Sequence, residues 1–212
     1  MAQFNLSWFN TAVITNSNAT GQRVSHRQKS VGGAYITAGY TPANDLPTTA
    51  SNIQSPVLAN NVIWEFKVEC LCQVGGPIPN NNGNREGLKF ACITPSLSWS
   101  TNTGTIVLNV AGLDITSATF ILRRLDNDVI QYGPTNIARV GNSISTTATG
   151  LDPDESYYWE IIMYATVNGV QIASNDVNQL NDSCFSGEFK TDEDVCGPIT
   201  DMDASVVELN IS

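Results

Sequence analysis

The stretch Leu151-Asp-Pro-Asp-Glu-Ser-Tyr157-Tyr-Trp159-Glu-Ile161-Ile-Met163-Tyr-Ala165 decides the fold of this chain. A turn-forming Asp-Pro pair opens it, and from position 157 onward apolar or aromatic side chains stand at every second position. This period of two is typical of a strand that buries one face. The stretch leads into Asn168-Gly169, a turn-forming pair. It therefore predicts a long β-strand with a turn at each end.

The same pattern occurs a second time, 93 residues earlier in the chain. The aligned pairs, which need no gap, are Leu151 with Leu58, Tyr157 with Trp64, and Trp159 with Phe66. Alternation continues through Val68, Cys70 and Cys72. Two units of this length, each the size of one β-sandwich, predict a tandem repeat.

A leucine, a proline two positions on and a tyrosine six positions on resemble a corner of the fibronectin type III domain, where the tyrosine hydroxyl bonds to upstream backbone. The resemblance implies an all-β fold: two tandem fibronectin type III or immunoglobulin-like β-sandwiches plus a C-terminal extension strand. The units are expected at residues 1–94 and 95–191, without a flexible linker, and residues 192–212 form an acidic linker and a last strand. In the first corner Trp64 replaces the tyrosine, so the same hydroxyl contact is not expected there.

The resemblance also implies how the strands are distributed. Residues 4–10 match the second strand of the family, so the first strand is expected to be missing from the first unit. Residues 170–182 are expected to form a long polar loop.

Bulk composition excludes several classes of protein. The chain has 212 residues and a net charge of −10, and no apolar run is long enough to span a membrane. Residues 96–212 carry 16 acidic and four basic side chains, so no nucleic-acid surface is expected. The weakly basic first half permits head-to-tail contacts with the acidic second half, although a solvated surface is the alternative. The N-terminus shows no signal peptide, so we expect assembly in a cytoplasm.

The five cysteines do not read as a disulfide framework, because their number is odd. Cys70 and Cys72 share the inward face of the first repeat and Cys92 lies on the next strand, so we interpret them as small buried side chains rather than zinc ligands. Cys184 and Cys196 are the candidates for a bridge under oxidising conditions.

No motif for catalysis or cofactor binding is present in the sequence. His26, the single histidine, stands where a core aromatic is expected, and we interpret it as a packing residue. The acidic clusters at residues 152–155 and 192–203 lack the spacing of a calcium loop, so turns and solvated charge are the preferred interpretation. We therefore expect no enzyme activity, no cofactor and no metal.

Two segments are candidates for partner contacts. The breaker-rich loop at 75–84 contains Asn80, Asn81 and Asn82, and long loops on rigid sandwiches often carry contacts, with simple length variation as the alternative. In residues 204–211, Val207, Leu209 and Ile211 share one face. We predict that this strand adds to a sheet edge of a neighbouring copy or of another protein.

A small, leaderless, Asn- and Thr-rich tandem of this kind looks like virion proteins of tailed phages, of the crAss-like group among others. That likeness implies a non-catalytic structural subunit of a tail, ring, baseplate or decoration layer, located in the virion. Its partners would be other copies of itself, in a ring or layer, and other virion proteins, with no membrane. The alternative is a bacterial surface or secreted module that binds carbohydrate or a host protein.

Overall fold

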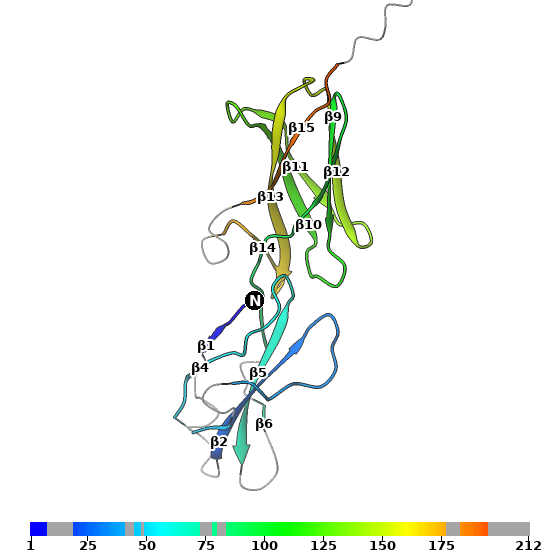
Figure 1. Ribbon diagram of the computed structural model, residues 1–212. Coiled ribbons are helices and arrows are strands. Elements are labelled where there is room, and N and C mark those ends of the chain that lie inside the picture. Colours follow the sequence, from blue (N-terminus) through cyan, green and yellow to red (C-terminus); the bar gives the residue numbers. More distant parts are fainter. Residues whose placement is uncertain are drawn as a thin grey trace, which may run out of the picture.

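The computed structural model describes residues 1–7, 19–40, 45–47, 49–72, 78–79, 84–176 and 183–194. Its elements are β-strands, which confirms the all-β fold class. Two sets of sheets follow one another along the long axis of the molecule, the first in residues 5–87 and the second in residues 96–190 (Figure 1). No helix among the described residues is long and apolar enough to cross a membrane.

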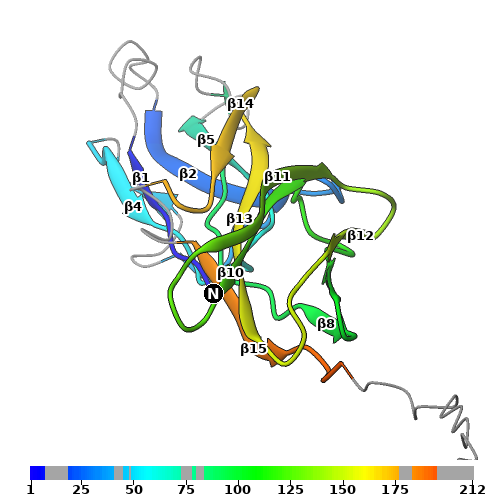
Figure 2. The same cartoon turned by 90° about the horizontal axis from the view of Figure 1, so that it is seen from above.

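The second unit is a two-layer sandwich. One sheet has the order β12-β9-β8, and the other has the order β11-β10-β13, with β14 and β15 both paired to the far edge of β13. The two layers are distinct in the view from above (Figure 2). The strands are β8 (Ser96–Trp99), β9 (Thr103–Asn109), β10 (Ser117–Arg124), β11 (Ile130–Ala138), β12 (Ser143–Thr149), β13 (Ser156–Val167), β14 (Val170–Ala173) and β15 (Cys184–Lys190).

The first unit repeats this plan, and most of its strands are shorter. Its larger sheet has the order β3-β2-β5, with β6 and β7 paired to β5, and its smaller sheet consists of β1 and β4. The strands are β1 (Asn5–Ser7), β2 (Ala19–Gln28), β3 (Asp45–Leu46), β4 (Asn52–Gln54), β5 (Trp64–Cys72), β6 (Ile78–Pro79) and β7 (Arg85–Gly87).

Apolar packing is unequal in the two units. In the second unit the alternate residues of β13 from Tyr157 to Ala165 are at most 1% exposed, as the period of two predicts. The first unit has a smaller separate cluster of Val24, Tyr40, Leu46 and Ile53. Three buried residues that precede position 95, Ile63, Leu88 and Phe90, pack in the cluster of the second unit, and the partly buried Ile93 packs against it.

Two loop expectations are wrong in part. Within the loop expected at residues 75–84, residues 78–79 form β6, which pairs with β5. Residues 170–173, expected within a long polar loop, form β14, which pairs back onto β13 through a tight turn. Asn168 and Gly169 both have positive φ angles, 50° and 78°, as a hairpin of this kind requires. The Asn168-Gly169 turn therefore adds one more strand, β14, to the larger sheet.

Candidate docking surface

The corner of the second unit contains the hydroxyl contact that the sequence pattern predicts. The Asp152 backbone N–H donates a hydrogen bond of 3.0 Å to the Tyr157 hydroxyl. Tyr157 and Trp159 have no exposed surface, and Leu151 is also buried. Burial raises the pKa of Tyr157 above its ordinary value, so the hydroxyl stays neutral. The corner thus joins the turn to the start of β13.

In the first corner an equivalent bond runs in the opposite direction. Trp64 Nε1 donates to the carbonyl oxygen of Ala59 at 3.1 Å, and Ala59 is the residue that aligns with Asp152. Leu58 and Phe66 are buried, whereas Trp64 is half-buried. The hydroxyl contact of the second corner is not made here, as expected, but the corner is closed by a different bond, because the Ala59 carbonyl accepts from the indole N–H.

Asn61 forms the centre of the junction between the two units. Its side chain accepts from the Ala91 N–H and donates to the Ala91 carbonyl, both at 2.9 Å. Its own carbonyl accepts from the Asp114 N–H at 2.8 Å, and the Asp114 carboxylate accepts from the Ile63 N–H at 2.6 Å. Asn61 has a positive φ of 59°, a conformation that asparagine tolerates better than most residues. These bonds join the first corner to the β9–β10 loop of the second unit.

A second contact joins β7 to the β13–β14 turn. The Asn168 N–H donates to the Glu86 carboxylate at 2.7 Å, and the Asn168 side chain bonds to both backbone groups of Glu86 at 3.2 Å. Lys29 forms an ion pair with the same carboxylate. The Lys29 ammonium and the Asn168 N–H together hold the pKa of Glu86 below its ordinary value. Glu86 therefore stays charged at neutral pH and links both units.

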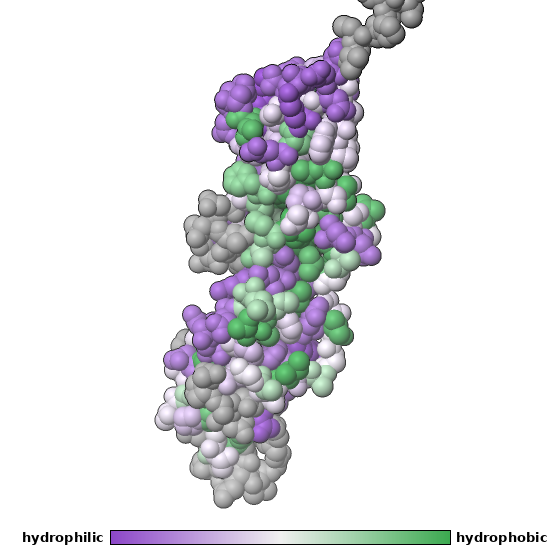
Figure 3. Space-filling view, in the orientation of Figure 1, coloured by the Kyte–Doolittle hydropathy of each residue, from purple (hydrophilic) through white to green (hydrophobic). Residues whose placement is uncertain are grey.

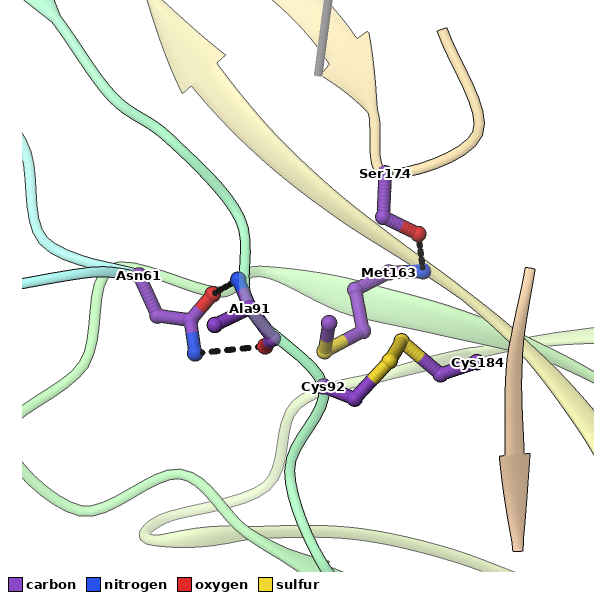
Figure 4. Close-up of a disulfide and its surroundings, with 6 residues drawn as sticks. All are labelled: Asn61, Ala91, Cys92, Met163, Ser174 and Cys184. Atoms are coloured by element: carbon purple, nitrogen blue, oxygen red, sulfur yellow. Dashed lines mark hydrogen bonds between the residues drawn. A yellow bond between two sulfur atoms is a disulfide. The ribbon is translucent and has the colours of Figure 1, made fainter. Parts of the chain in front are cut away.

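A disulfide between Cys92 and Cys184 adds a covalent connection (Figure 4). Cys92 lies close to Ala91, which Asn61 holds, and Cys184 begins β15 of the second unit. Two expectations are corrected here: Cys92 is not a buried thiol, and the partner of Cys184 is not Cys196. The reason is that residues 88–94 leave the first unit after β7 and pack on the second unit, which places Cys92 beside β15. Cys70 takes no part in this disulfide, and its side chain is buried.

The outer edge of β1 borders a groove of about 560 Å³. The groove extends from β1 across β7 to the β13–β14 hairpin, and hydrophobic residues are exposed around this middle part of the molecule (Figure 3). Its apolar lining residues are Phe4, Leu6, Phe66, Leu88, Val167, Val170 and Ile172. Arg85 and Lys89 also line it, and both side chains are exposed.

The two candidates for catalysis or metal binding, His26 and the acidic cluster at residues 152–155, form hydrogen bonds, ring contacts and ion pairs within the protein. His26 is buried, its Nδ1 lies 3.0 Å from the Tyr40 hydroxyl, and its ring packs edge-on against Trp64. Burial lowers the pKa of His26 and raises that of Tyr40, so both are neutral at pH 7. The acidic cluster is ion-paired: Asp152 and Glu155 contact Arg124 at 2.9 and 2.8 Å, and Asp154 pairs with Lys190. Within the described ranges, no group of three metal-ligating side chains occurs.

The predicted contact residues lie elsewhere in the chain. Asn80, Asn81, Asn82, Val207, Leu209 and Ile211 all fall outside the described residues. The junction residues Asn61, Asp114, Glu86 and Asn168 were not singled out from the sequence. Only Asn168-Gly169 gave a signal, as a turn, because contacts between residues 82 positions apart leave no local pattern.

No protein-family model matches the chain, and no curated protein matches it. A solved structure of two fibronectin type III domains from chicken tenascin is similar at 13% identity, covering 89% of this chain and 92% of that one, with a TM-score of 0.45. A structure of chicken CNTN1 FN1-FN3 domains is similar at 8% identity, covering 90% of this chain and 62% of that one, with a TM-score of 0.37.

Proposed function

We propose that this protein is a non-catalytic structural subunit that docks to other proteins in a multi-copy assembly. Within that class we propose a tail, ring, baseplate or decoration layer of a tailed-phage particle, with other copies and other virion proteins as partners. The observation that carries the proposal is the junction, where the Cys92–Cys184 disulfide, the Asn61 and Asn168 hydrogen bonds and shared apolar packing join the units. A junction of this kind suits a subunit whose two units must keep one angle in every copy.

The chemistry of the described side chains supports a role without catalysis. His26 packs between aromatic rings, and the carboxylates beside the second corner are neutralised by Arg124 and Lys190. A general acid, base or nucleophile needs a free, accessible side chain with a positioned partner. The exposed surface is therefore the functional part of this molecule.

Mass spectrometry of gradient-purified particles from an infected culture tests the proposal. We expect the chain in the particle fraction at many copies per particle, in a fixed ratio to the other particle proteins. Recovery of the chain only in the host envelope or in the particle-free medium would contradict a virion role.

A second candidate, a bacterial surface or secreted binding module, is favoured by the disulfide, because disulfides persist in oxidising compartments and on surfaces. Trp99 is 46% exposed and stacks on Phe189 with ring centres 5.7 Å apart, so one aromatic side chain is available to a sugar ring. Tryptophan fluorescence during titration with host glycans measures this binding. A response that Trp99→Ala abolishes would support the second candidate, and no response to any glycan would count against it.

A further inference from the structure

The smaller sheets of the two units differ by one strand. In the second unit β9 pairs with β12 on one side and with β8 on the other, and Leu97 of β8 lies opposite Ile106. In the first unit β1 pairs with β4, and among the described residues no strand pairs with its other edge. Leu6 lies opposite Ile53 in the first unit, and Ile106 lies opposite Thr146 in the second. Ile53 and Thr146 are aligned positions, because they stand 93 residues apart. The outer edge of β1 therefore corresponds to the place that β8 fills in the second unit.

The backbone of β1 shows which groups this edge presents. Ala2 and Phe4 exchange hydrogen bonds with Leu58 and Ser55, so even-numbered residues direct their backbone groups toward β4. In an antiparallel pair the alternate residues direct theirs the other way. The N–H and C=O groups of Asn5 and Ser7 therefore face away from β4. An added strand would use these groups in the same way that β8 uses those of β9.

The groove beside this edge has an apolar lining that suits such a strand. Phe4 packs on Phe66 with ring centres 5.2 Å apart, and together with Leu6 and Leu88 these rings give the groove an apolar wall. In the second unit β8 lies beside the last strand, where Trp99 stacks on Phe189 of β15. In the first unit β7 occupies the place of that last strand, and the groove lies between β1 and β7.

We propose that residues 204–211 of a second copy occupy this groove as an added strand on β1. This proposal deepens the proposed function, on which it rests, by naming the contact between copies. Val207, Leu209 and Ile211 alternate with more polar positions, so one face of this segment is apolar and matches the groove wall. One of the three takes the place that Leu97 has in the second unit.

Charge complementarity favours the same occupant. Asp201, Asp203 and Glu208 lie in or directly before the proposed segment, and residues 192–212 contain no Lys or Arg. Arg85 and Lys89 border the groove, and neither forms an ion pair with a described residue. Glu86 also lines it, but Lys29 pairs with its carboxylate. Opposite charges on a segment and its binding groove guide association and orient the bound strand.

The reach of the chain favours a second copy over the same copy. The last described residues lie beside Asp154, at the far end of β13 from the groove (Figure 1). That strand has 12 residues and spans about 36–40 Å. Residues 195–203 cover about 30–35 Å when fully extended. The segment of the same copy would enter only as a stretched chain, whereas a neighbouring copy meets no such limit.

Sedimentation velocity of the full chain, from about 1 to 300 µM, tests this contact. We expect dimers and longer head-to-tail species. Each copy has one groove and one segment 204–211, so each added copy leaves another groove to fill. The variant Val207→Glu/Leu209→Glu/Ile211→Glu, here called the tail variant, replaces the apolar face by charge. It should raise the apparent Kd of association about tenfold or more. Val206→Glu/Asn210→Glu/Ser212→Glu adds the same three charges on the opposite face, so it is the matched control and should assemble like the wild type.

Mixing two deficient variants makes the test sharper. The first groove variant, Asn5→Pro, removes an N–H of β1 that faces away from β4. The second groove variant, Arg85→Glu/Lys89→Glu, leaves the backbone of β1 unchanged and reverses the charge beside the groove. Each groove variant alone should be monomeric, and mixed with the tail variant it should form a one-to-one dimer and no longer species. Assembly of the tail variant at wild-type affinity, or a wild-type chain that stays monomeric throughout, would overturn the proposal. Particles that contain the tail variant normally would overturn this contact and leave the proposed function intact.

Discussion

The two units share one strand pattern and differ in how completely they bury their apolar side chains. In the second unit Trp159 has no exposed surface and lies between Phe120 and Tyr132, and the smaller sheet has three strands. In the first unit the equivalent Phe66 lines an open groove, and the described smaller sheet has two strands. The second unit therefore has the more complete core, and we propose that the first unit provides a surface for a partner.

The largest expected effect is the loss of core packing in the second unit. Trp159→Ala removes a fully buried side chain and should lower the free energy of unfolding by about 3–5 kcal/mol. Phe66→Ala, at the aligned position, should cost less, about 3 kcal/mol, at the lower end of that range, because its neighbours at the groove can relax. Urea denaturation of both variants measures the difference, and a greater loss at Phe66 would reverse the comparison.

Next in size is the effect of the covalent link between the units. Cys92→Ser/Cys184→Ser should lower the free energy of unfolding by about 2–4 kcal/mol, because the disulfide joins residues 92 positions apart. Thermal unfolding with and without reductant measures it. Reductant should lower the Tm of the wild type and of the control Cys70→Ala, and it should leave the double variant unchanged. A wild-type Tm that does not respond to reductant would contradict the link.

A smaller effect is expected at the two corners. Tyr157→Phe leaves the Asp152 N–H without its acceptor and should cost about 1–2 kcal/mol. Trp64→Phe removes the donor to Ala59, but water can reach this half-buried corner, so the cost should be about 0.5–1 kcal/mol. Urea denaturation of both variants measures these costs. Equal losses of unfolding free energy would show that the two corner hydrogen bonds contribute equally.

The smallest expected effect is a pH dependence confined to the first unit. Burial holds the pKa of His26 below that of an unfolded chain, which is about 6.5. The unfolded state therefore binds a proton first as pH falls, and stability should decrease between about pH 7.5 and 5.5. Glu86 has a lowered pKa and titrates below this window. His26→Phe should flatten the dependence in unfolding curves, and an unchanged slope would assign it to another group.

The sequence predicted the fold well because its signals were local and repeated. Alternation from Tyr157 to Ala165 and its copy around Phe66 placed the strands β13 and β5, and the Asn168-Gly169 turn placed the end of β13. The junction and the disulfide were not predictable, because Asn61, Glu86 and Cys92 find partners across the unit boundary. Spacing of cysteines alone does not determine which ones pair.

Amide hydrogen exchange, resolved by residue in NMR spectra, tests most directly whether the first unit presents an open sheet edge. In a dilute, monomeric sample we predict slow exchange for Phe4 and Leu6, which bond toward β4, and fast exchange for Asn5 and Ser7. At concentrations where copies associate, the amides of Asn5 and Ser7 should become protected. Equal protection of all four amides in the dilute monomer would show that the edge is already paired and would contradict the account.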